Sequence, residues 1–217
     1  VHVESSLDVH APSILVLGEA TLLTSAGASL SLTANHVNVT AGLISCTGTG
    51  GTVVVNSTGD PLVVGGEITA STIVFHSAAD MTFDAGTVLT ASSTIELGTA
   101  HNVMLGPGCK FTAGSTIELE GAYDVTLGSD TVFTASKIEF IRVHVILLGS
   151  GSVFTASTIE FIRAHDILLG SDSVFTASTI VLNSTHDVSL GSDVTLGSGA
   201  ASTTVVIDGP NNLTLGS

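Results

Sequence analysis

Four glutamates recur at nearly equal spacing through the middle of the chain. They are Glu96, Glu118, Glu139 and Glu160, separated by 21 or 22 residues. Carboxylates stacked one strand spacing apart repel one another, so such a column attracts cations or shares protons. Ca²⁺ is the cofactor that this pattern would favour, although it takes about six to eight oxygens and each period offers one carboxylate. The alternative is no cofactor, with Lys137, Arg142 and Arg163 neutralising part of the column.

A second column of chemically active side chains is built from imidazoles. His101, His144, His165 and His186 share one position of the period, with Tyr123 between the first two. The residues that follow them are Asn102, Asp124, Val145, Asp166 and Asp187. Imidazoles on adjacent periods could bind a transition metal, with the neighbouring carboxylates orienting the rings. The alternative is a solvated corner in which each histidine hydrogen-bonds an aspartate, and Tyr123 and Val145 interrupt the pattern.

The elements that must position these columns repeat with the same period. The threonine of the "FTAS" motif and its equivalents recurs at Thr69, Thr90, Thr112, Thr134, Thr155 and Thr176, and we extend this column upstream through Ser45 and Thr24. Within one period, residues 153–156, 158–161 and 166–169 alternate apolar and polar side chains, which is typical of short strands. Alternation places Phe154, Ile159, Phe161, Ile167 and Leu169 on one side, together with Ala156. Repeats of 20 to 50 residues indicate solenoids.

Three short strands in each period of 21 or 22 residues predict an all-β parallel β-helix. We expect one domain over residues 1–217, with nine or ten coils and the apolar columns stacked inside. Right-handed coiling is expected from the handedness of parallel crossovers. The segments 46–51 and 197–202 should lengthen two corners without disturbing the columns. Cys46 and Cys109 fall three coils apart, about 14 Å, and are therefore expected as unpaired buried thiols.

The repeated "GSD" turns end at Asp130, Asp172 and Asp193. We expect tight corners in which the glycine adopts positive φ and the aspartate caps the backbone.

Composition narrows the classes of partner. Four Lys and Arg residues stand against nineteen Asp and Glu residues, a formal net charge of −15. Such a surface repels phosphate backbones, so neither nucleic acid nor an anionic membrane is an expected partner. No apolar run reaches the roughly 18 residues that span a bilayer, so membrane insertion is not expected. Enzymes on this fold need paired acids or a metal with a base in a cleft, and here the acids form columns, so no enzymatic activity is expected.

Four sequons suggest a secreted protein. Asn38, Asn56, Asn183 and Asn212 each begin an Asn-X-Ser/Thr sequence and are candidate glycosylation sites. We place Asn38 on an outward strand position and Asn56 and Asn183 on corners. Glycosylation at these sites would indicate a eukaryotic-type secretory pathway.

Two features of the sequence resemble known β-helices: the stacked apolar columns, and the turns "DVTLGSD", "DILLGSD" and "DVSLGSD" at residues 124–130, 166–172 and 187–193. The sequence resembles the right-handed β-helices of filamentous-haemagglutinin-like adhesins, autotransporter passengers and related surface proteins. This resemblance covers nearly the whole chain and implies the fold and an extracellular or cell-surface setting.

Both ends of the sequence read as strand, without a capping helix. Because an open coil is a template for another chain, we expect a segment of a longer β-helix or a module that stacks end to end. The expected function is an extracellular structural or adhesive rod in a surface fibre, wall or filament. Its partners would be copies or neighbouring segments of the same solenoid, and glycans. The alternative is a carbohydrate-binding or polysaccharide-cleaving β-helix that uses the Glu or His columns.

Overall fold

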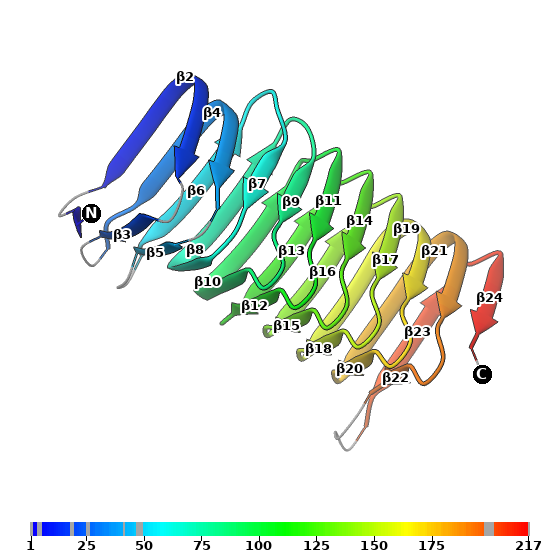
Figure 1. The fold of residues 1–217 in the computed structure, drawn as a ribbon. Coiled ribbons are helices and arrows are strands. Elements are labelled where there is room, and N and C mark those ends of the chain that lie inside the picture. Colours follow the sequence, from blue (N-terminus) through cyan, green and yellow to red (C-terminus); the bar gives the residue numbers. More distant parts are fainter. Residues whose placement is uncertain are drawn as a thin grey trace.

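The chain coils into a stack of three-sided turns in which every strand pairs with its equivalent in the next coil (Figure 1). The computed structural model describes residues 2–3, 6–17, 20–24, 27–40, 42–46, 50–197 and 202–216. These residues form one 24-stranded sheet whose pairings are parallel. The predicted parallel β-helix is confirmed, and its right-handed coiling stays a prediction.

The first face of the coil carries the "FTA" motif of each repeat. Its strands are β1 (His2–Val3), β3 (Ala20–Thr24), β5 (Gly42–Cys46), the first parts of β8 (Glu67–Ser77) and β10 (Val88–Gly98), and β12 (Lys110–Ala113), β15 (Val132–Thr134), β18 (Val153–Thr155), β20 (Val174–Thr176) and β22 (Thr195–Leu196).

The second face carries the glutamate column. It comprises the first parts of β2 (Leu7–Leu17) and β4 (Leu30–Val39), β6 (Thr52–Ser57), the second parts of β8 and β10, β13 (Thr116–Glu120), β16 (Lys137–Ile141), the first parts of β19 (Thr158–Leu169) and β21 (Thr179–Leu190), and β23 (Thr204–Asp208).

The third face closes the coil. It comprises the second parts of β2, β4, β19 and β21, with β7 (Leu62–Val64), β9 (Met81–Phe83), β11 (Asn102–Leu105), β14 (Asp124–Leu127), β17 (Val145–Leu148) and β24 (Asn212–Leu215).

The strand register confirms the predicted number of coils. On the second face, ten described residues follow one another in register: Leu7, Leu30, Val53, Ile73, Ile95, Ile117, Ile138, Ile159, Ile180 and Val205. One upstream assignment is wrong, because the partner of Ser45 is Leu23, and Thr24 pairs with Cys46. A step from either Leu23 or Thr24 to Ser45 fits a period of 21 or 22 residues, so spacing did not distinguish them.

Aromatic side chains fill the core as predicted. Phe154 is fully buried between Phe133 and Phe175, with ring centroids 5.1 and 4.8 Å away and nearly parallel planes. Phe140 and Phe161 stack in the same way at 4.8 Å. Ring stacking adds about 0.5–1.5 kcal/mol per pair to the burial of apolar surface. The core is therefore continuous along the axis.

The "GSD" corner differs from the prediction. Positive φ falls on Asp130, Asp172 and Asp193, at 56°, 58° and 56°. The glycine two residues earlier is required for another reason: a Cβ on Gly170 would lie 2.5 Å from the Leu148 carbonyl oxygen in the preceding coil. Glycine is needed at this position because two coils approach too closely for a side chain.

Other sequence predictions have mixed outcomes. Cys46 and Cys109 are both buried and no disulfide joins them, as predicted. The two lengthened corners lie largely outside the described residues, which omit 47–49 and 198–201. The part of the chain that the structure describes holds no helix with the length and apolarity to cross a bilayer.

Candidate functional site

The glutamate ladder forms on the outward side of the second face. Glu96, Glu118, Glu139 and Glu160 pair in register, one on each of four successive coils. Lys137 lies beside the last two glutamates of this ladder, with Nζ 2.7 Å from Glu139 Oε1 and 3.0 Å from Glu160 Oε2. The lysine thus neutralises part of the column, as the sequence suggested.

Glu118, earlier in the ladder, is still repelled by the neighbouring carboxylates. Burial raises the pKa of Glu118, and the charges of Glu120, Glu139 and Glu96 raise it further. Arg142 pairs with Glu120, which lies beside the ladder, so its predicted neutralising role falls on a different carboxylate. Among the described residues, the Arg163 guanidinium has no carboxylate within ion-pair distance. Ca²⁺ binding by the ladder stays a prediction.

The imidazole column forms a second ladder at the corner between the second and third faces. Its rings stack in the order His101, Tyr123, His144, His165 and His186, with centroid distances of 5.6, 4.5, 4.8 and 4.5 Å. The interplanar angles do not exceed 20°. Tyr123 therefore continues the stack and does not interrupt it.

Histidines in this ladder bind aspartates across coils. His144 Nδ1 lies 3.4 Å from Asp124 Oδ1 of the preceding coil, and His101 Nδ1 lies 3.3 Å from Asp80 Oδ1. His186 repeats the pattern, with Nδ1 2.8 Å from Asp166 Oδ1. The predicted hydrogen bonds between histidine and aspartate are confirmed, and the aspartate comes from the coil before.

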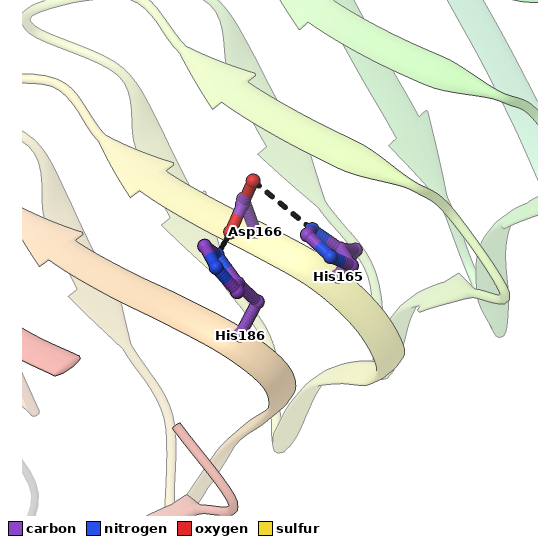
Figure 2. A group of neighbouring side chains, drawn as sticks. All are labelled: His165, Asp166 and His186. Carbon is purple, nitrogen blue, oxygen red and sulfur yellow. Dashed lines mark hydrogen bonds and ion pairs between the residues drawn. The ribbon is translucent and has the colours of Figure 1, made fainter. Parts of the chain in front are cut away.

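His165 departs from this rule because of Val145. The position that would supply its carboxylate in the preceding coil holds this valine, which pairs with Asp166 in the strand register. His165 Nδ1 instead lies 3.1 Å from Asp166 Oδ2 in its own coil. Two imidazoles consequently converge on one carboxylate (Figure 2).

Burial and hydrogen bonding shift the pKa values of Asp166 and His186. Partial burial acts to raise the pKa of Asp166, but the hydrogen bond from His186 and the close contact with His165 outweigh it and the net shift is downward. The hydrogen bond to Asp166 raises the pKa of His186. His165 Nδ1 is closed off from solvent and makes no well-aligned hydrogen bond. The cluster of His165, Asp166 and His186 could hold a metal ion, since its ligand atoms lie within 4.8 Å of one another.

A shallow groove of about 510 Å³ runs beside the imidazole ladder. Tyr123, His144 and His165 line it together with Arg142 and Arg163. Both arginines adopt positive φ, at 55° and 56°, in the repeat position that Gly121 holds in the coil before Arg142. The groove therefore brings aromatic edges and guanidinium groups together on an otherwise acidic protein.

The sequons lie in strands, and one predicted placement is wrong. Asn38 occupies a strand position as predicted. Asn56 lies near the end of β6 and not on a corner, because strand pairing with the coils on either side continues through it. Asn183 lies inside β21 where the strand passes from the second face to the third. It pairs with Asp208, and the pairing with β19 shifts register beside it, in keeping with the predicted corner. The Nδ2 atoms of Asn183 and Asn212 donate to Asp208 and Asp187. Glycosylation of all four asparagines stays a prediction.

Sequence reasoning missed a buried polar column at the "GSD" corner. Thr87, Cys109, Thr131, Ser152 and Ser173 occupy equivalent positions and are fully buried. Thr131 Oγ1 and Ser152 Oγ donate to the Gly128 and Gly149 carbonyl oxygens at 2.6 and 2.7 Å, and Cys109 Sγ donates to Asp84 O at 3.2 Å. The sequence signal was a hydroxyl or thiol directly after five successive corner residues, which are Gly86, Gly108, Asp130, Gly151 and Asp172.

No protein-family model, curated protein or solved structure matches this chain.

Proposed function

We propose that this chain is a structural or adhesive module, a rigid extracellular β-solenoid rod in a surface fibre, wall or filament. The observation that supports this most is the repetition of outward chemistry: four glutamates in register on the second face and five stacked rings at the adjoining corner. A repeated surface suits binding along a line. Catalysis usually needs one singular constellation of groups.

The core supplies the rigidity that a rod requires. Coils are joined by parallel strand pairs, and the stacked phenylalanines make the interior continuous across them. In such a stack each coil is stabilised mainly by its neighbours. The proposed similarity to filamentous-haemagglutinin-like adhesins and autotransporter passengers rests on this architecture and on the repeated turns.

Axial stacking is the proposed mode of self-association. Val205, Leu213 and Leu215 continue the inward columns of Ile180, Val188 and Leu190 into the coil of β23 and β24, where they are 39%, 48% and 65% exposed. A further coil in register on this face, from a second copy or from a neighbouring segment of the same protein, would bury them. Exposed strand edges favour such additions because their backbone groups are ready to pair.

Glycan binding is a second candidate, favoured by the groove beside the imidazole ladder. Tyr123 offers an aromatic ring that is half exposed, and Arg142 and Arg163 offer donors suited to carboxylate or sulfate groups on sugars. This activity is compatible with an adhesive rod.

A paired assay tests the proposal. Wild-type protein, Glu139→Gln and His165→Ala are incubated with acidic and neutral polysaccharides, and new reducing ends and retained glycan are both measured. The structural role predicts no turnover in any sample, and glycan retention would assign the adhesive form. Turnover by the wild type that either substitution abolishes would refute a purely structural role.

A further inference from the structure

We propose that His165, Asp166 and His186 bind a divalent transition-metal ion of the Zn²⁺ type. The cluster lies on β19 and β21, where the imidazole ladder passes between two coils (Figure 2). Two imidazole nitrogens and one carboxylate oxygen form the ligand set of many zinc centres, with water in the fourth position.

The distances within the cluster lie on both sides of those of such a centre. His186 Nδ1 and His165 Nδ1 lie 2.8 and 3.1 Å from the two oxygens of Asp166. Ligands about 2.1 Å from a tetrahedral zinc ion are roughly 3.4 Å apart. These two nitrogen-to-oxygen separations need to open by about 0.3–0.6 Å. Because the two nitrogens contact different oxygens of Asp166, the widest separation in the cluster, up to 4.8 Å, must close by about 1.4 Å.

The two rings must also turn their Nδ1 atoms toward each other. They stack at 4.5 Å with 15° between their planes, so their lone pairs do not yet converge. Side-chain exposures of 42% for His165 and 46% for His186 leave room for that rotation. Asp187 Oδ2, 3.5 Å from His186 Nδ1, is positioned to replace the water as a fourth ligand.

The polar environment of His165 provides a second reason. Its Nδ1 is closed off from solvent without a well-aligned hydrogen bond, although a buried ring nitrogen ordinarily has a partner. A cation between His165 and His186 would satisfy this nitrogen and would take the place of the proton shared between His186 Nδ1 and Asp166.

The site is specific to this step of the ladder. His101 and His144 each contact an aspartate of the preceding coil, Asp80 and Asp124 respectively. Val145 occupies the position that would supply an aspartate to His165 from the preceding coil. Among the described residues, His165 and His186 are the one pair of histidines in the ladder that shares an aspartate. Nitrogen ligands select Zn²⁺, Cu²⁺ or Ni²⁺ over Ca²⁺, which prefers an all-oxygen site.

Calorimetric titration of the EDTA-treated chain with ZnCl₂ tests the proposal. The expected result is one Zn²⁺ per chain, with affinity reduced at least tenfold by His186→Ala and by Asp166→Asn, because each removes a proposed ligand and the loss of an outer-shell partner alone costs about 10–100-fold. His101→Ala is the matched control, because it removes a histidine of the same ladder outside the cluster, and it should leave the affinity unchanged.

Circular dichroism checks that each variant is folded, and Asp166→Asn, which keeps the side-chain shape, serves if His186→Ala does not fold. A Co²⁺ absorption spectrum from the wild type, absent in Asp166→Asn, gives a readout of nitrogen and oxygen coordination. Absence of saturable binding would overturn the proposal. Equal weakening by His101→Ala and His186→Ala, or displacement of Zn²⁺ by an equal concentration of Ca²⁺, would overturn it as well.

Discussion

Substitution of Gly170 by alanine should destabilise the coil although glycine there does not adopt positive φ. The added Cβ would lie 2.5 Å from Leu148 O, 2.6 Å from Gly149 C and 2.7 Å from Gly149 O, all backbone atoms of the preceding coil. Ordinary contact begins near 3.4 Å, so the two coils must separate locally by about 0.9 Å.

The magnitude follows from what that separation disturbs. Gly151 N of the preceding coil donates to Ser171 O at 2.9 Å next to this position, and inter-coil hydrogen bonds weaken beyond about 3.2 Å. Overpacking of this kind costs about 1–3 kcal/mol. In a chain of this size, each kcal/mol lowers the melting temperature by about 2–4 °C.

Asp172→Gly is the matched control at the same corner. Asp172 has φ 58°, and the equivalent residues Gly86, Gly108 and Gly151 are glycines with positive φ. Relief of the left-handed backbone offsets the greater entropy of glycine in the unfolded chain, so the variant should range from neutral to about 1 kcal/mol more stable. Urea unfolding followed by circular dichroism measures both. An unchanged Gly170→Ala together with a clearly destabilised Asp172→Gly would refute this account of the corner.

Three further changes test the core and the glutamate ladder. Phe154→Ala removes the ring between Phe133 and Phe175 and should cost about 3–5 kcal/mol, while Val153→Ala on the outward side of the same strand should cost below about 1 kcal/mol; urea midpoints compare the two. Glu118→Gln should raise the thermal unfolding midpoint at pH 7 and have little effect near pH 3. The folded-state pKa of Glu118 is raised, so its contribution to stability is lost as the pH rises through that pKa. Thermal melts that show no pH-dependent difference between variant and wild type would contradict the repulsion. Lys137→Met should cost up to about 1 kcal/mol, less in concentrated salt, and an effect insensitive to salt would argue against ion pairing.

The sequence predicted the fold because the repeat carries register and alternation together. Phe154 and Ile159 recur in equivalent positions on neighbouring coils, and a one-residue slip would turn those side chains to the outside. Thr24 was misaligned because two registers one residue apart both satisfied the period. The period therefore predicted the register correctly where large apolar side chains recur, and less reliably where the repeated residue was a threonine or serine.

Contacts between coils were harder to predict than positions within one coil. The close approach at Gly170 and the positive φ of Asp172 depend on how the chain crosses its neighbour, which spacing does not encode. Val145 looked like a defect in the imidazole column, yet its lack of a carboxylate is what leaves His165 to share Asp166. The ladder was readable from sequence, and its partners across coils were not.

Electron microscopy of the purified chain over a range of concentrations tests the proposed structural role most directly. The proposal predicts straight rods of constant width whose length increases with concentration, because the apolar columns at Leu213 and Leu215 favour the addition of further coils in register. Compact particles of one uniform size at every concentration would contradict it.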